Sequence, residues 1–160
     1  MARNPRRIRE ALQALYAELP AMECRGLCQQ SCGPIQMSAE ERRIIESQHG
    51  PVEARPPTAT CSMLRMGRCL AYVDRPMICR LWGVIDAMPC PWGCVPEGGR
   101  LNDADGLAFL AAAEQIGGGK VVGMDARTMR ELLALPGAHE FFREYVQNGL
   151  DADARRRRSS

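Results

Sequence analysis

Three short stretches hold every cysteine of this chain: CRGLCQQSC at residues 24–32, CSMLRMGRCLAYVDRPMIC at residues 61–79 and CPWGC at residues 90–94. Cysteine is normally scarce in a cytoplasmic protein, so eight of them within residues 24–94 call for a chemical reason. Three explanations compete, namely thiolate ligands to a metal, disulfide bonds and inert buried thiols. We favour metal, because grouped cysteines in a reducing compartment more often bind metal or catalyse than form bridges.

Thiolate sulfur is a soft ligand that selects zinc, iron–sulfur clusters or copper(I). A tetrahedral zinc site takes up to four thiolates, and a [4Fe–4S] cluster also takes four. The spacing does not say which thiols share a site, so two sites, or one site with spare thiols, are both open. The candidate metal ligands are all eight cysteines: Cys24, Cys28, Cys32, Cys61, Cys69, Cys79, Cys90 and Cys94.

The two histidines, His49 and His139, are isolated from the cysteine groups, so we expect ligation by sulfur alone. Six of the nine methionines lie in or near the same window, which makes copper(I) conceivable, although methionine is usually flexible core filler. Zinc and an iron–sulfur cluster are nearly even as the expected cofactor. We lean slightly to the cluster because the cysteine runs are irregular and free of histidine.

Length and charge narrow the class of protein. A chain of 160 residues can bury a core without needing disulfides to hold it together. Apolar runs fall short of the ~20 residues of a membrane span, and the basic start lacks the apolar core of a secretory signal. We therefore expect a cytoplasmic protein with no membrane association. The net charge of +2 does not favour a nucleic-acid partner.

Helical patterns flank the cysteine-rich part. Asn4-Pro5 starts a predicted helix over residues 5–19, which Pro20 stops. The capping box that begins at Ser38 predicts a second helix, from about residue 39 to 48, ended by Gly50. Three more helices are predicted in the last third, one capped by Asn102 or Asp103 and reaching residue 116, one capped by Asp125, and one over residues 138–147.

The cysteine-rich part itself shows little regular periodicity, and nine of the eleven prolines lie in it or at its edges. Residues 60–64 and 69–73 predict a short hairpin around Gly67, and Asp74 is expected to cap a short helix that reaches Leu81. Because the pattern offers little apolar packing, we expect bound metal to supply folding free energy here.

The predicted fold class is mainly α with a small β-hairpin, in which helices pack around an irregular, metal-stabilised, cysteine-rich core. We expect a single domain over residues 1–149. It would comprise the cysteine-rich metal-binding part at 24–94 and the C-terminal helices at 102–149, followed by a disordered basic tail at 150–160.

The segment from Cys61 to Trp82 also carries a family resemblance. Its pattern, C-x7-C-x3-V-D-R-P-x2-C-R-L-W, is similar to the second half of the YkgJ-type cysteine-cluster family, a zinc- or iron-chelating domain named for a CxxCxxCC motif. The resemblance covers residues 24–82, and RP-x-x-CR is its most specific part. The first cluster departs from the family, since it reads C-x3-C-x3-C and is one thiol short, so Cys90 and Cys94 are candidate replacements.

Arg75 and Arg80 stand beside the cysteines in this motif. A thiolate site is negatively charged, so a neighbouring guanidinium would offset that charge and donate hydrogen bonds to sulfur. The expected function is a cytoplasmic metal-binding protein with a structural or redox role. One alternative is a metal-dependent enzyme, such as a methyltransferase-like member of the family, since the family that the sequence resembles includes a flagellin lysine methylase. The other is a metal-shaped interaction module that meets a larger protein partner.

Overall fold

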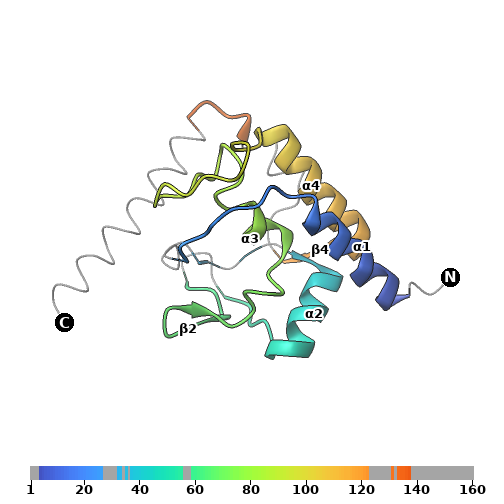
Figure 1. Ribbon diagram of the computed structural model, residues 1–160. Helices are drawn as coiled ribbons and strands as arrows, with labels where there is room; N and C mark the ends of the chain where they lie inside the picture. The colour runs from blue at the N-terminus through green and yellow to red at the C-terminus, as the bar shows by residue number, and fades with distance from the viewer. Residues whose placement is uncertain are drawn as a thin grey trace.

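The computed structural model describes residues 4–26, 32, 33, 35, 37–55, 59–122, 131 and 133–137. Within these ranges the chain forms four named α-helices and two two-stranded antiparallel sheets (Figure 1). The predicted fold class, mainly helical with a small antiparallel hairpin, is confirmed. None of the described helices has the length and apolar character needed to cross a membrane.

The first helix, α1 (Pro5–Ala17), begins as the sequence predicts. The Asn4 side chain accepts a hydrogen bond from the backbone N–H of Arg6 at 3.0 Å, and Pro5 occupies the first turn. Its apolar stripe is anchored by Leu12, which is fully buried. The α1 helix runs beside α4 (Asp103–Gly117), so these two long helices form one wall of the molecule (Figure 1).

The second helix, α2 (Ala39–His49), carries the predicted capping box. The Ser38 hydroxyl accepts from the N–H of Glu41, and the Glu41 carboxylate accepts from the N–H of Ser38 at 2.8 Å. The helix ends at Gly50, whose φ of 89° suits a residue without a side chain. Both isoleucines of α2 are buried and face the rest of the protein.

The α4 helix begins at the predicted cap, where the Asn102 side chain accepts from the N–H of Asp105 at 2.9 Å, and it ends at left-handed Gly118. The chain then enters β4 (Lys120–Val122), which pairs antiparallel with β1 (Met37–Ser38). This second small sheet was not predicted. It joins the end of α4 to the start of α2.

The predicted hairpin is present but shorter than expected. Its strands are β2 (Leu64–Arg65) and β3 (Arg68–Cys69), not residues 60–64 and 69–73. The two residues between them have positive φ, 47° at Met66 and 74° at Gly67, as a tight hairpin turn requires. Extra turns at either end of the hairpin shorten the strands.

The short helix α3 (Met77–Leu81) lies where the sequence places it, but the prediction that Asp74 caps it is wrong. Its N-cap is Pro76, with no side-chain hydrogen bond. The Asp74 carboxylate is instead engaged by His49, whose Nε2 lies 2.8 Å away. The Asp74 carboxylate therefore bonds to His49, at the end of α2, instead of capping α3.

The expectation that the cysteine-rich part lacks apolar packing is also wrong. Residues from that part enter both buried clusters of the protein, because short turns bring apolar side chains inward without a regular period. The larger cluster contains Leu12, Ile44, Met77, Leu81, Ile85, Ala87, Leu107, Leu110 and Ala113. The smaller contains Met37, Ile45, Met63 and Ala71, with the side chains of Cys61 and Cys69 packed against it.

The predictions for the C-terminal part lie largely outside the described residues. Of the helix expected after Asp125, Glu131 and Leu133 are helical and Leu133 packs against the larger cluster. The helix expected over residues 138–147 and the tail expected at 150–160 fall outside the described ranges.

Candidate metal centre

The hairpin brings two cysteines together. The N–H of Leu64 bonds to the carbonyl of Cys61 at 3.1 Å, so Cys61 sits in the turn that leads into β2. Cys69 ends β3 and is paired with Leu64 across the hairpin. Both thiols are partly buried against the smaller apolar cluster. Residues eight apart in sequence are thereby placed at the same end of the hairpin.

Cys32 reaches this end of the hairpin through the backbone. The N–H of Cys61 donates to the carbonyl of Cys32 at 2.8 Å, which lays the Cys32 segment directly against the turn before β2. The Cys32 side chain is partly buried. A cysteine from the first sequence group thus joins two cysteines from the second.

Cys79 comes from α3. Met77 and Leu81 on this helix are buried in the larger cluster, and they fix how the short helix is turned. At about 100° per residue, Cys79 lies roughly opposite Met77 on the helix, away from that anchoring side chain. Apolar packing on one side therefore positions the thiol on the other.

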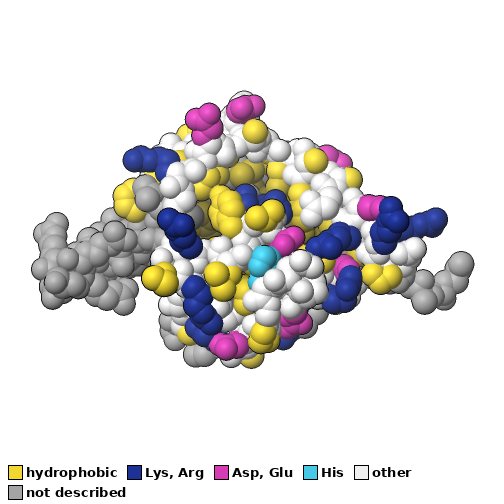
Figure 2. Space-filling view, turned by 60° about the horizontal axis from the view of Figure 1, so that its bottom comes forward, with side chains coloured by type: hydrophobic (Ala, Val, Ile, Leu, Met, Phe, Trp, Pro, Cys, Tyr) yellow, Lys and Arg dark blue, Asp and Glu magenta, His cyan; other side chains and the backbone are white. Residues whose placement is uncertain are grey.

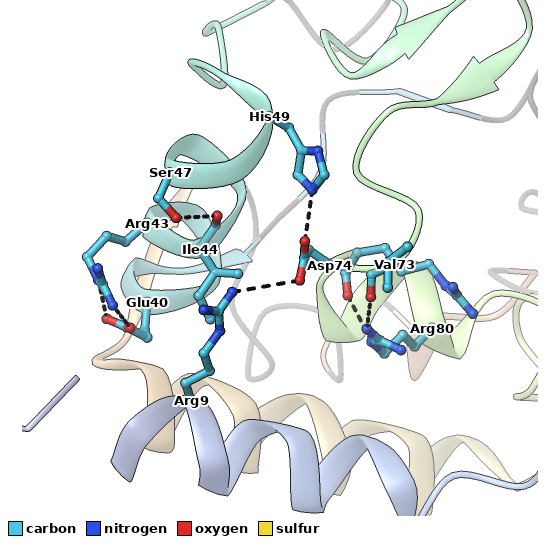
Figure 3. A network of polar contacts seen from close by, with 10 residues as sticks. Arg9, Glu40, Arg43, Ile44, Ser47, His49, Val73, Asp74 and Arg80 are labelled. Atoms are coloured by element: carbon cyan, nitrogen blue, oxygen red, sulfur yellow. Dashed lines mark hydrogen bonds and ion pairs between the residues drawn. The ribbon is translucent and has the colours of Figure 1, made fainter. Parts of the chain in front are cut away.

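Polar contacts hold the loop between β3 and α3 (Figure 3). Arg80 donates from Nε to the carbonyl of Arg75 and from a terminal nitrogen to the carbonyl of Val73, each at 2.8 Å. On the other side, Asp74 meets His49 of α2, and Arg9 of α1 lies 4.0 Å from the same carboxylate. The loop is thus fixed from two helices and from α3 itself.

The Cys79 thiol interacts electrostatically with three other cysteines. Burial raises the pKa of the Cys79 thiol well above its ordinary value, and negative charge on the Cys32, Cys61 and Cys69 thiolates raises it further. These side chains must therefore lie close enough to interact. We call Cys32, Cys61, Cys69 and Cys79 the four-thiol group.

Arg75 lies beside this group. Its positive charge lowers the pKa of both Cys69 and Cys79, in opposition to the larger effect of burial. The guanidinium stacks over the Tyr72 ring at 4.1 Å from the centroid and donates to the Tyr72 carbonyl at 2.9 Å. These contacts hold a positive charge near the sulfurs of Cys69 and Cys79, and the role expected for Arg75 beside a metal-bound thiolate site stays a prediction.

Arg80 has a different position. Besides its two bonds to backbone carbonyls, its guanidinium stacks over the Tyr16 ring at 4.0 Å from the centroid. Its pKa is lowered by burial first and by Arg75 second, while Cys79 is among the groups that raise it. Arg80 therefore holds the loop that carries Arg75 through bonds to backbone carbonyls, and its charge interacts with that of Cys79.

The other described cysteines make contacts that do not involve the four-thiol group. Cys90 and Cys94 interact with one another, and Cys24 is exposed with its sulfur accepting from the N–H of Gly26 at 3.4 Å. Cys28 is outside the described residues. No disulfide bond joins any two of the described cysteines.

The described side chains do not form a closed metal site as they stand. Within the described ranges, no three histidine, cysteine, aspartate or glutamate side chains are placed so that they could share one ion.

Sequence reasoning missed the role of Glu41. This carboxylate is 3% exposed and accepts from the Tyr16 hydroxyl at 2.7 Å and from the backbone N–H of Met77 at 2.8 Å. It thereby ties α3, which carries Cys79, to α1 and α2. The capping box marks Glu41 as a helix-start residue, but a bond to a residue 36 positions later leaves no local signal.

Comparison with protein-family models, with curated proteins and with solved structures gives no match to this chain. The resemblance to the YkgJ-type cysteine-cluster family stays a prediction that rests on the motif between Cys61 and Trp82.

Proposed function

We propose that this chain is a metal-binding protein in which the four-thiol group holds zinc or an iron–sulfur cluster. The observation that carries the proposal is that a backbone hydrogen bond of 2.8 Å lays Cys32 against Cys61 at the end of the hairpin that also holds Cys69. Charge on these three thiols raises the pKa of Cys79, after the larger effect of burial. Apolar packing accounts for Cys61 and Cys69, which lie against the smaller cluster, but Cys32 and Cys79 are not among the residues packed there. Four thiolates are also the ligand number that either metal centre takes.

The residues around the group suit a thiolate centre. Burial raises the pKa of the Cys79 thiol, and negative charge on the Cys32, Cys61 and Cys69 thiolates raises it further. A bound cation removes that repulsion, and Arg75 offsets part of the charge that remains on a tetrathiolate. Zinc would supply a structural crosslink between the three segments, and an iron–sulfur cluster would add one-electron redox chemistry.

The test is elemental and spectroscopic analysis of protein purified without oxygen. We expect tightly bound metal. Zinc in a colourless protein would indicate a tetrathiolate site, whereas iron with matching sulfide and a broad blue–violet band would indicate a cluster. Cys61→Ser should lose that metal, and Thr60→Ser, the exposed neighbour, should keep it. Equal metal content in the wild type and Cys61→Ser would refute the four-thiol assignment.

A second candidate function, an interaction module shaped by metal, is favoured by exposed apolar side chains on the hairpin and the loop after it. Met66 at the hairpin tip is fully exposed, and Leu70, Tyr72 and Val73 are each 45% exposed or more. Figure 2 shows hydrophobic side chains gathered in a hollow on the lower face of the molecule, with Lys and Arg side chains around it. Apolar groups exposed together often mark a protein interface.

An affinity pull-down tests this second function. The wild type should enrich one partner, and the double variant Met66→Ser with Val73→Ser should lose it. Val95→Ser is a matched control, because Val95 is also exposed but lies on a different loop. Recovery of the same proteins with all three would remove the interaction surface from consideration.

A further inference from the structure

The hairpin places two arginines directly opposite one another. Arg65 ends β2 and Arg68 begins β3, and the two are partners in the register of the sheet. Side chains of such partners project from the same face with Cβ atoms about 4.5–5.5 Å apart, and like charges in this position destabilise the pairing. Leu64 and Cys69 form the next pair and face the other way, toward the smaller apolar cluster that Cys69 contacts. The two guanidinium groups therefore start from the outer face of the hairpin.

The described part of the chain supplies little negative charge to offset this pair. Arg65 donates to the carbonyl of Leu64 at 3.3 Å, and the ion pairs between described residues include neither Arg65 nor Arg68. The Glu53 carboxylate is bound by Arg55 at 2.6 Å. Arg55 lowers the pKa of Glu53 most, and the charge of Arg65 adds a smaller effect. An anionic group from outside the chain would relieve the repulsion, and guanidinium groups bind carboxylates with directed hydrogen bonds.

The tip between the two arginines carries a methionine whose side chain is fully exposed. Met66 has a φ of 47°, a conformation that Asn, Asp and Gly adopt more readily, and Gly67 follows it at 74°. The hairpin lies at the periphery of the molecule, away from α1 and α4 (Figure 1). Packing within the described part of the chain therefore does not explain a methionine here. An exposed residue in a strained conformation points to a role outside the fold, and methionine adapts to many binding surfaces.

The exposed apolar surface continues beyond the hairpin and favours a protein as the partner. Leu70 and Val73 are 50% and 78% exposed. Nucleic acid would stack its bases on aromatic rings, but these side chains are aliphatic, and Arg75 already covers one face of the Tyr72 ring. A bilayer is a poorer match as well. Met66, Leu70 and Val73 together offer less apolar surface than one acyl chain, which by itself binds a membrane only marginally.

We infer that the outer face of the hairpin, formed by Arg65, Met66 and Arg68 with Leu70 and Val73 beside it, docks an acidic segment of a partner protein. A carboxylate of that segment binds between the two guanidinium groups, and a neighbouring apolar side chain meets Met66. This inference rests on the second candidate function, the interaction module, and adds the chemistry of the partner. Complementary charge of this kind sets the register in which two proteins meet.

Selection from a random peptide library, with the full chain as bait, tests the inference. We expect the recovered peptides to carry Asp or Glu beside apolar residues and to bind less tightly as salt rises. Arg68→Glu should weaken their binding about tenfold or more. The same substitution should leave the urea midpoint unchanged or higher, because it replaces a repulsive cross-strand pair with an attractive one. Arg7→Glu is the matched control, since it makes the same change of charge at the exposed start of α1 and should not alter binding.

The double variant Met66→Ser with Val73→Ser separates this inference from the function on which it rests. If the recovered peptides lose affinity for it but bind Arg68→Glu as tightly as the wild type, the surface stands and the acidic partner is overturned. If they bind both variants as tightly as the wild type, the interaction surface fails too. Vesicles containing phosphatidylserine and a labelled single-stranded oligonucleotide are the alternative probes. Binding of the wild type to either of them, with no acidic peptide recovered, would overturn the inference in favour of a lipid or a nucleic acid.

Discussion

The carboxylate of Glu41 in α2 accepts a hydrogen bond from the hydroxyl of Tyr16 in α1 at 2.7 Å, across 25 residues of sequence. The same oxygen accepts from the N–H of Met77, and the other oxygen accepts from both the N–H and the hydroxyl of Ser38. One buried carboxylate thus receives four donors from three parts of the chain. A carboxylate is fitted to this place because it only accepts, and every group around it donates.

Glu41→Gln should therefore destabilise the protein although it barely changes the shape of the side chain. The amide nitrogen of glutamine would face donors on one side, either Ser38 or the pair from Tyr16 and Met77, and at least one buried N–H would lose its acceptor. We expect the free energy of unfolding to fall by about 2–3 kcal/mol. Urea denaturation followed by circular dichroism would measure it.

The control for this substitution is Glu10→Gln. Glu10 pairs with Arg6 on the exposed side of α1 at 2.9 Å, so its loss should cost under about 0.5 kcal/mol. Equal effects of the two substitutions would show that the four bonds to Glu41 contribute no more than an exposed ion pair.

Tyr16→Phe should change how stability depends on pH. Burial raises the pKa of the Tyr16 phenol well above its ordinary value, the Glu41 carboxylate reinforces the shift, and Arg80 opposes it. Below about pH 10 the phenol is protonated in both the folded and the unfolded chain, so it adds no pH dependence. Above that pH the unfolded chain releases the proton and the folded chain keeps it, which favours unfolding as pH rises.

The stability advantage of the wild type over Tyr16→Phe should therefore be constant from pH 7 to 9 and shrink above pH 10. The decline should approach about 1.4 kcal/mol per pH unit. Parallel denaturation curves at each pH measure the difference, and the other titrating groups cancel between the two proteins. A difference that stays constant up to pH 11 would contradict the raised pKa.

Gly117→Ala should be destabilising, against the usual gain of an alanine in a helix. A Cβ at Gly117 would lie 2.5 Å from Ser38 Cβ and would overlap Ser38 Oγ, the hydroxyl that caps α2 and bonds Glu41. Ser38 is fully buried and cannot withdraw. We expect a loss of about 1–3 kcal/mol by chemical denaturation. Gly106→Ala should be destabilising as well, because its Cβ would lie 2.4 Å from Cγ2 of Ile85, a β-branched side chain that is 1% exposed.

Local signals in the sequence predicted the elements well. The Asn4 and Asn102 caps and the capping box that starts at Ser38 are confirmed, because each depends on residues within one turn of a helix. The hairpin around Gly67 is also confirmed, because its tight turn depends on neighbouring residues with positive φ. Asp74 shows the limit, since it also carries a local capping signal but bonds to His49 instead. The residues next to Asp74 in sequence do not indicate that His49, at the end of another helix, will bond to its carboxylate.

The grouping of the cysteines was not predictable in the same way. Spacing relates neighbours in sequence, but Cys32 joins the four-thiol group through a backbone bond to Cys61, and Cys79 joins it because apolar anchors orient α3. The two-residue strand β1 meets β4 more than 80 residues later, which is too short a pairing to leave a pattern. These features depend on tertiary packing, so only the structure supplies them.

The proposal that metal stabilises the cysteine-rich part can be tested by treating the purified protein with a chelator. Because Met77, Leu81 and Ile85 of the cysteine-rich part are buried against α4, chelation should leave α1, α2 and α4 protected from hydrogen exchange. The hairpin has little such support beyond the small cluster that holds Met63 and Ala71. We therefore expect the loss of protection to concentrate in residues 59–76, where metal would crosslink the turn, β3 and α3.

Cys79→Ser should reproduce that pattern in metal-loaded conditions, because serine removes one thiolate while leaving the apolar anchors of α3 in place. Ile78→Val is a suitable control, since Ile78 is its neighbour and packs only against the larger cluster, where one methylene costs about 0.5–1.5 kcal/mol. Hydrogen exchange read by mass spectrometry distinguishes the two, as Ile78→Val should lower protection evenly and Cys79→Ser only at the hairpin. Identical protection of residues 59–76 with and without metal would mean that apolar packing alone orders this part of the chain. Metal binding would then not contribute to its folding.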